Sequence, residues 1–430
     1  MVTIAEVRLW NRLVGYVTWE ENNARAIFEY TPEFTSSGLE LSPLMMPLRG
    51  GGPYTFPSIG KDTFMGMPGM LADALPDAYG KALLNQWLAL SGRGEGEANP
   101  VERLCYQGSR SMGALEFRPA NDLVLEQSAA VEIQALVEAA TQALNQKAGL
   151  DERLSDDAQR AILNIIKVGT SAGGQRAKAV IAMNDETKEI RSGQVAAPEG
   201  FNHWLIKLDG VSNGMLGDPM DFGRIEYAYY LMAKNAGIDM MECRLLEENG
   251  RAHFMTRRFD RVGNEDKIHM QTLCGIAHYD FRQPGAYSYE QALMVMRRMR
   301  LPFPDAVQLF RRAVFNVIAR NQDDHTKNIS FLMDKKGIWR LSPAYDMAWA
   351  YNPEGIWTSR HQMSINGKRD NIAKDDLVAL ASSASISTPK ANSIIEEVAD
   401  AVATWHETAK DCGIAEKTID AIESTHVLKL

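Results

Sequence analysis

The stretch Asp323-Asp-His-Thr-Lys-Asn328, with Tyr345-Asp346 beyond it, decides how this 430-residue chain is interpreted. Between them, apolar residues predict two short strands joined by the turn Asp334-Lys-Lys-Gly337. A hairpin returns the chain to where it started, so Asp346 is expected to lie beside Asn328. The sequence thus predicts one site that contains Asp323, Asn328 and Asp346.

The residue types in this predicted site suit phosphoryl transfer. Magnesium prefers a near-octahedral shell of oxygen ligands, which Asn328 and Asp346 can supply while water and phosphate fill the other positions. Asp323 can act as the base that takes a proton from a hydroxyl nucleophile, a role typically worth roughly 10²–10⁴ in rate. Kinase-type sites have the same order along the chain: a base aspartate, then an asparagine and a second aspartate that bind metal. We therefore predict a kinase that uses ATP and Mg²⁺.

Two other interpretations of the stretch stay open at this point. Asp323, Asp324 and Asn328 could serve only as turn formers, because such side chains stabilise turns by hydrogen bonds to the backbone. Asp323, Asp324 and His325 could instead hold a transition metal, since carboxylate with imidazole suits such ions. The absence of a second histidine-rich cluster in the sequence weighs against that metal.

Composition places the chain among ordinary globular proteins and limits its partners. It is 45% hydrophobic and 23% charged, as in typical folded domains, and its length favours two or more domains or subdomains. The formal net charge of −9 argues against a protein that binds nucleic acid over its whole surface. Contact with DNA would therefore need a partner.

The cysteines and the N-terminus indicate a reducing compartment. The four cysteines form no C-x-x-C pair, and Met1-Val-Thr-Ile-Ala-Glu6 shows no basic and apolar export segment. No apolar run approaches the ~18 residues that a membrane-spanning helix needs. We expect a cytoplasmic protein without membrane insertion.

Periodicity along the chain predicts an α+β fold in three parts. Alternating apolar residues in the first fifty positions predict an antiparallel sheet. The expected parts are a β-rich N-terminal subdomain over 1–120, an ATP-binding lobe over 121–262 and a helical C-terminal lobe over 263–430 that carries the catalytic and metal-binding loops. The ATP-binding lobe is predicted to contain a helix from Ser155 to about Gly169, strands at 179–183, 203–208 and 252–256, and a helix at 224–236.

Turn and cap residues predict further elements of the C-terminal lobe. Ser288-Tyr-Glu-Gln291 has the pattern of a capping box that opens a helix. A second helix is predicted from Phe310 to Arg320, just before the site stretch, and Asn366-Gly367 predicts a two-residue hairpin turn. Helices are expected from about Asp375 onward.

A loop of small residues and two lysines could complete an ATP site. The loop is Gly169-Thr170-Ser171-Ala172-Gly173-Gly174-Gln175, where backbone N–H groups can approach phosphate oxygens. It is neither a Walker A nor a dinucleotide motif, so a purely structural loop is the alternative. Lys178 or Lys207, on the strands that follow, could neutralise phosphates, although a solvated surface position is common for such lysines. Glu226 could pair with Lys207, as a helix glutamate does in protein kinases.

Taken together in this order, the motifs resemble the HipA family of serine/threonine kinases. The residues that carry the resemblance are Gly169 to Gln175, Ile206-Lys207-Leu208, Arg258-Phe-Asp-Arg261, Asp323 to Asn328, and Pro343-Ala-Tyr-Asp346. Leu75-Pro-Asp77 and Gly108-Ser-Arg-Ser-Met-Gly-Ala114 are similar to that family's N-terminal subdomain. The resemblance spans nearly the whole chain and leaves little weight for the turn-former interpretation.

The resemblance implies a fold distantly like protein and phosphoinositide kinases, together with a role for each site residue. Asp323 would be the catalytic base, Asn328 and Asp346 would bind magnesium, and Lys207 would contact ATP phosphates. Arg257, Arg258 and Phe259 match the adenine-binding linker, where backbone groups contact the base. In the family's loop a serine is autophosphorylated; here Thr170 stands at that position with Ser171 beside it, so either is the expected site.

The resemblance also implies partners and a cellular role. Family members are toxins of toxin–antitoxin pairs that phosphorylate aminoacyl-tRNA synthetases and cause growth arrest or persistence. They are restrained by a small helix-turn-helix antitoxin, HipB-like, which binds operator DNA. Two alternatives remain: a kinase-fold protein with little catalysis that acts mainly as a co-repressor with the antitoxin on DNA, and a small-molecule or lipid kinase.

Overall fold

The structure is a computed structural model that describes residues 2–90, 92–94, 97–119, 131–145, 177–211, 221–263 and 266–430. Chain contacts divide it into two units, which we describe separately. Unit 1 comprises Met1–Leu41, Met46–Gly223 and Arg244–Met270, and unit 2 comprises Ser42–Met45, Arg224–Cys243 and Gln271–Leu430. The boundaries of the three predicted parts remain a prediction.

The N-terminal sheet in unit 1 has the predicted antiparallel strands and one strand more. Its order is β3-β2-β1-β4, with β1 at Ile4–Leu9, β2 at Arg12–Glu20, β3 at Arg25–Tyr30 and β4 at Leu115–Arg118. Alternate residues of β1 are buried, because a strand directs successive side chains to opposite faces. The sequence did not predict β4, because a strand of four residues is too short to show a clear alternation of apolar and polar side chains.

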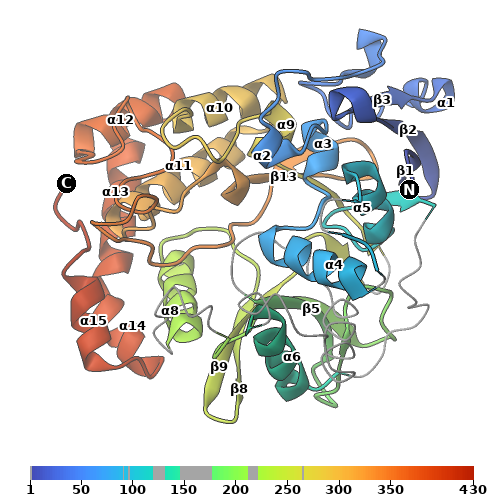
Figure 1. Cartoon of the computed structure of the whole chain (residues 1–430). Helices are drawn as coiled ribbons and strands as arrows, with labels where there is room; N and C mark the ends of the chain where they lie inside the picture. The colour runs from blue at the N-terminus through green and yellow to red at the C-terminus, as the bar shows by residue number, and fades with distance from the viewer. Residues whose placement is uncertain are drawn as a thin grey trace. The chain divides into compact units, whose positions relative to one another are not determined.

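A five-stranded sheet forms the second part of unit 1 (Figure 1). Its order is β6-β5-β7-β9-β8, with β5 at Lys178–Asn184, β6 at Ile190–Ser192, β7 at Phe201–Lys207, β8 at Cys243–Glu248 and β9 at Arg251–Arg257. The strands predicted near 179–183, 203–208 and 252–256 are confirmed as β5, β7 and β9. Apolar side chains of α4 (Ala78–Leu90) and α6 (Ile133–Asn145) pack against this sheet around Trp204 and Ile206.

A buried ion cluster joins the Gly108–Ala114 stretch of unit 1 to Asp260. The Asp260 carboxylate forms ion pairs with the guanidinium groups of Arg258, at 2.7 Å, and Arg261, at 2.8 Å. It also accepts a hydrogen bond from the Gly113 N–H at 2.7 Å. Gly113 has a φ of +77°, and a Cβ there would lie 2.9 Å from the Met270 backbone nitrogen, so only glycine fits. Burial acts to raise the pKa of Asp260, but the two guanidinium groups hold it well below its usual value.

Among the described residues of unit 1, the other α-helices and strands are short. They are α1 (Pro32–Thr35), α2 (Lys61–Phe64), α3 (Gly69–Ala72), α5 (Pro100–Gln107), β10 (Arg261–Val262) and β11 (Asp266–Lys267). Asn99 caps α5, because its side chain accepts the backbone N–H of Glu102 at 2.9 Å. The helix predicted from Ser155 to Gly169 lies outside the described residues.

Unit 2 is mainly helical, as predicted for the C-terminal lobe. Its helices are α8 (Phe222–Asn235, which begins at the end of unit 1), α9 (Leu273–Ala277), α10 (Tyr289–Arg298), α11 (Phe303–Ile318), α12 (Lys374–Ser383), α13 (Thr388–Ala403), α14 (Trp405–Asp411) and α15 (Glu416–Glu423). Their core includes the buried rings of Tyr229, Phe315 and Trp405.

The predicted helix cap and hairpin turn are present in unit 2, and one helix begins earlier than predicted. The capping box of Ser288 and Gln291 is present in α10. Asn366 and Gly367 both have positive φ, as a two-residue hairpin turn requires. Helix α11 begins at Phe303, seven residues before the predicted start, because prolines are accepted in the first turn of a helix and do not end it.

The predicted hairpin after Asn328 is also present. Strands β13 (Ser330–Met333) and β14 (Trp339–Leu341) pair antiparallel, and β12 (His269–Thr272) is the third strand of their sheet. Residues Thr326–Asn328 form a 3-10 turn, so the first strand of the hairpin starts at Ser330. Within the described ranges, no helix is both long and apolar enough to cross a membrane.

Candidate active site

The loop that carries Asp323 follows α11 in unit 2 and is held by backbone hydrogen bonds. His325 N–H donates to the Asp323 carbonyl at 2.9 Å, and Asn328 N–H donates to the His325 carbonyl at 2.9 Å. The Thr326 hydroxyl donates to the Tyr279 carbonyl at 2.7 Å. These bonds fix the 323–328 backbone as a tight turn rather than a flexible connection.

Asp324 anchors this loop in the interior of unit 2. Its buried carboxylate accepts the Tyr289 hydroxyl at 2.9 Å, the Gln362 backbone N–H at 2.7 Å and a ring nitrogen of His361 at 3.0 Å. Three donors occupy the carboxylate oxygens, so Asp324 does not converge with Asp323 and His325 on a common ligand. This arrangement argues against the transition-metal interpretation and gives Asp324 a structural role.

Asp323 is less buried than Asp324 and keeps 38% of its side chain exposed. The Trp357 indole N–H donates to its Oδ1 at 2.6 Å, and His325 Nε2 lies 3.8 Å from the same oxygen. Enclosure by protein atoms and the charge of Asp346 raise the pKa of Asp323, whereas His325 and the indole N–H act in the opposite direction. The charge of Asp346, which follows the hairpin, therefore acts on Asp323.

Asn328 lies just before the β13–β14 hairpin and Asp346 just after it. The Asn328 amide nitrogen donates to the Asp323 carbonyl at 2.9 Å, which leaves the amide oxygen on the other side of the group. The Tyr345 hydroxyl donates to the Lys327 carbonyl at 2.6 Å and so ties the end of the hairpin to the loop. Asp346 itself has a φ of +57°, a strained conformation that clusters at functional sites.

The two candidate phosphate lysines are opposed in register on neighbouring strands of unit 1. Lys178 on β5 pairs with Lys207 on β7. The Lys178 side chain is buried and its Nζ lies 2.8 Å from Asp77 Oδ2, so the Leu75-Pro-Asp77 stretch supplies its counter-charge. Lys207 is half-buried, with Nζ 5.8 Å from the centre of the Phe254 ring. Glu226 is buried on α8, in unit 2.

The stretch expected to contact adenine is fixed mainly by its side chains. Arg257 donates to the Asn202 side-chain oxygen at 2.7 Å, and the Arg258 guanidinium is buried against Asp260. The backbone N–H of Arg258 already donates to the His203 carbonyl at 2.9 Å. Only the other backbone groups of Arg257, Arg258 and Phe259 are therefore left to contact adenine, and that contact stays a proposal. The loop Gly169–Gln175, including Thr170 and Ser171, lies outside the described residues.

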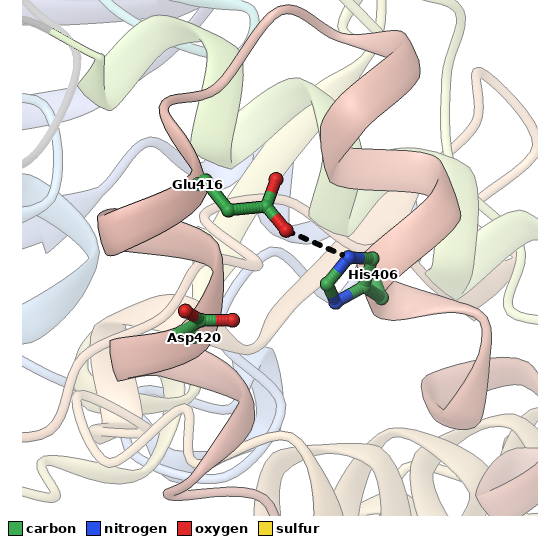
Figure 2. A group of neighbouring side chains, drawn as sticks. All are labelled: His406, Glu416 and Asp420. Atoms are coloured by element: carbon green, nitrogen blue, oxygen red, sulfur yellow. Dashed lines mark ion pairs between the residues drawn. The ribbon is translucent and has the colours of Figure 1, made fainter.

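A separate group of metal-type donors lies on α14 and α15 (Figure 2). Among the described residues it consists of His406, Glu416 and Asp420, whose donor atoms lie within 4.8 Å of one another. His406 Nε2 is 3.2 Å from Glu416, and its Nδ1 is 3.0 Å from Glu423. The hydrogen bond with Glu423 raises the pKa of His406. Both ring nitrogens face carboxylates, so His406 links the two helices through Glu416 and Glu423.

The donor set around Asp323 fits a magnesium nucleotide better than it fits a softer metal. One carboxylate and one amide oxygen, from Asp346 and Asn328, are hard ligands that leave most of an octahedral shell to water and phosphate. A third group, the part-exposed Asp323, lies beside them without being needed as a ligand. The donor atoms of these residues are of the kinds that a magnesium nucleotide site needs.

Sequence reasoning missed several contacts around these sites. Trp357, Asp77 and the network around Asp324 were not identified as partners of the site residues. Leu75-Pro-Asp77 and Gly108–Ala114 were marked by family resemblance alone, and the structure gives them physical roles. No local pattern points to Trp357, because its partner is 34 residues away.

Comparison with known proteins identifies the family. The model of the HipA-like C-terminal domain matches residues 170–405, more than half of the chain, and the model of the HipA N-terminal domain matches residues 5–118. The chain has the fold of HipA from Shewanella oneidensis, solved in complex with HipB and operator DNA. That likeness has a TM-score of 0.63 at 15% identity and covers 98% of this chain and 95% of that chain.

Two relatives from Sinorhizobium fredii are similar in sequence over shorter stretches. The candidate kinase Y4mE is 26% identical over 196 residues, which cover 42% of this chain and 46% of that protein. The candidate kinase Y4dM is 26% identical over 237 residues, which cover 51% of this chain and 56% of that protein. The chain thus spans about half the length of these relatives. With both domain models matched in order, this chain belongs to the HipA family.

Proposed function

We propose that this chain is a Mg-ATP-dependent serine/threonine protein kinase that acts as the toxin of a toxin–antitoxin pair. The observation that carries the proposal is the placement of Asp323, Asn328 and Asp346 around one loop and hairpin of unit 2. Membership of the HipA family and the kinase names of the relatives support it. In this proposal Asp323 is the catalytic base, and Asn328 and Asp346 are the metal ligands.

The proposed reaction is a direct transfer in which Asp323 handles the proton. The substrate hydroxyl oxygen forms a bond to the γ-phosphorus of ATP as the bond to ADP breaks, and the hydroxyl proton passes to Asp323. Mg²⁺, when bound by Asn328 and Asp346, neutralises charge on the phosphates. Lys207 is proposed to neutralise phosphate charge, whereas the charge of Lys178 is already balanced by Asp77. Gly169 to Gln175 are proposed to cradle the phosphates.

The proposed partners follow from the family and its solved relative. A small helix-turn-helix antitoxin would bind this chain and carry most of the contact with operator DNA, since the net charge of −9 disfavours direct binding. The relative of known structure was solved with HipB and DNA. We further propose a protein substrate of the translation machinery, such as an aminoacyl-tRNA synthetase.

A filter-binding assay with γ-labelled ATP tests the kinase proposal. The purified chain with Mg-ATP should transfer label to protein, and EDTA should abolish the transfer, because Asn328 and Asp346 cannot position the phosphates without the ion. Restoring Mg²⁺ in excess should return the activity. A preparation that binds ATP yet transfers no label to itself or to a cell extract would contradict the proposal.

That negative result would favour the second candidate, a co-repressor with little catalysis. The solved complex of the related HipA with HipB and DNA is the observation behind this alternative. The polar set of Asp323, Asn328 and Asp346 speaks against it, because a role in architecture alone does not require these groups.

Autophosphorylation at Thr170 or Ser171 is a further part of the proposal. A phosphate there adds about −1.5 to −2 charges and would compete with ATP phosphates for the same loop. Intact mass and peptide mapping after incubation with Mg-ATP should find one added phosphate in the 169–178 peptide. An unmodified peptide from active enzyme would refute this site.

A further inference from the structure

We propose that Trp357 is a positioning residue for Asp323, an inference that rests on the proposed kinase function. The Trp357 indole N–H donates to Asp323 Oδ1 at 2.6 Å across 34 residues of sequence. This is a hydrogen bond to a charged acceptor, the stronger class of such bonds. It sets the rotation of the carboxylate that the mechanism uses.

The bond distinguishes the two oxygens of Asp323. Oδ1 is occupied by Trp357 and also faces His325 Nε2 at 3.8 Å. Within the described part of the chain, Oδ2 receives no hydrogen bond, and the Asp323 side chain keeps 38% exposure. Oδ2 is therefore the oxygen presented to the substrate hydroxyl, and Oδ1 is the oxygen that holds the group in place.

Trp357 is itself fixed by the network that anchors the loop. The Gln362 side-chain amide donates to the Trp357 carbonyl, and the Gln362 backbone N–H donates to Asp324 at 2.7 Å. Asp324 and Asp323 are adjacent in the chain, so the path from Asp324 through Gln362 and Trp357 returns to Asp323. A closed path of this kind holds the indole rigidly, because a shift at one bond strains the others.

Ring contacts restrain the indole from the side. The Phe281 ring centre lies 6.5 Å from that of Trp357 and 5.2 Å from that of His325. His325 and Trp357 are 6.4 Å apart. These mutual contacts among the three rings leave the indole little freedom to turn away from the carboxylate.

Loss of this bond should affect turnover and leave nucleotide binding alone. A base must lie within about 2.6–3.2 Å of the proton that it accepts, and a freely rotating carboxylate meets that condition less often. Trp357→Phe is expected to lower kcat roughly tenfold, as the loss of one charged hydrogen bond would. KM for ATP and the thermal midpoint should stay near the parent values.

A matched control is Trp349→Phe in the same unit. The Trp349 indole N–H donates to the Thr425 hydroxyl at 3.1 Å, so this change removes a bond of the same kind from a neutral acceptor. Its kcat should equal that of the parent. A Trp357→Phe variant with parental or higher kcat, or one whose loss matches that of Trp349→Phe, would overturn the inference while the kinase proposal stands.

A spectroscopic readout separates the inference from the kinase function. The indole N–H proton resonance of Trp357, assigned by its loss in Trp357→Phe, should lie downfield and move upfield in Asp323→Ala. If Trp357→Phe fails to fold, 3-benzothienylalanine at position 357 removes the N–H and keeps the ring shape. A resonance unmoved by Asp323→Ala overturns the positioning role. An inactive parent with the expected resonance instead contradicts the kinase proposal.

Discussion

Replacing Asp323 with asparagine is expected to lower phosphoryl transfer by roughly 10²–10⁴ while ATP binding is retained. The amide can still accept the Trp357 indole N–H, so the local structure should persist, but it cannot take a proton from the substrate. Initial rates of label transfer, with ATP affinity measured by calorimetry, check the two halves of this expectation.

Asp334→Asn is the control for that change. Asp334 is exposed in the turn between β13 and β14, where its Oδ1 accepts the N–H groups of Lys336 and Ile338, which an asparagine oxygen can also do. Its rate should equal that of the parent. If Asp323→Asn also transferred phosphate at the parent rate, Asp323 would not be the base.

The second large effect is expected on stability, at Asp260 in unit 1. Asp260→Asn leaves the guanidinium groups of Arg258 and Arg261 buried without their counter-charge. Breaking a buried ion pair from one side typically costs about 3–5 kcal/mol. Urea unfolding followed by tryptophan fluorescence should show a fall of this size in the free energy of unfolding of unit 1.

The pH dependence of this stability has a definite sign. The pKa of Asp260 is depressed in the folded state. Asp260 therefore stabilises the fold at pH values above its unfolded-state pKa of about 3.9, and this stabilisation is lost as the pH falls through its folded-state pKa. The parent should therefore lose stability on acidification more steeply than Asp260→Asn.

The control for Asp260 is an exposed pair in the same unit. Glu189 lies 2.7 Å from Arg191, with side chains 39% and 30% exposed, and surface pairs are worth less than about 1 kcal/mol. Glu189→Gln should barely move the urea midpoint. Equal, small losses for both variants would show that the Asp260 cluster does not stabilise the fold.

Features set by neighbouring residues could be predicted from the sequence. The capping box at Ser288, the Asn366-Gly367 turn and the hairpin that returns Asp346 to Asp323 depend on a few residues each. Their geometry follows from hydrogen bonds and φ preferences within the segment. For that reason the hairpin that separates Asn328 from Asp346 could be predicted from the amino-acid sequence alone.

Contacts between distant segments could not be predicted in the same way. Gly113 and Asp260 meet across 147 residues, and Lys178 meets Asp77 through the packing of α4 beside β5. Such pairs depend on how whole elements pack, which no local pattern encodes. Arg258 shows the consequence, because a residue expected near adenine has a side chain buried in a structural ion pair.

Binding of Mn²⁺ with ATP, followed by electron paramagnetic resonance of the free ion, tests the central claim most directly. The claim is that Asn328 and Asp346 hold a divalent ion with the nucleotide next to Asp323. The parent and Asp323→Asn should both remove Mn²⁺-ATP from solution, whereas Asn328→Ala combined with Asp346→Ala should not. Equal binding by the double variant and the parent would contradict the account.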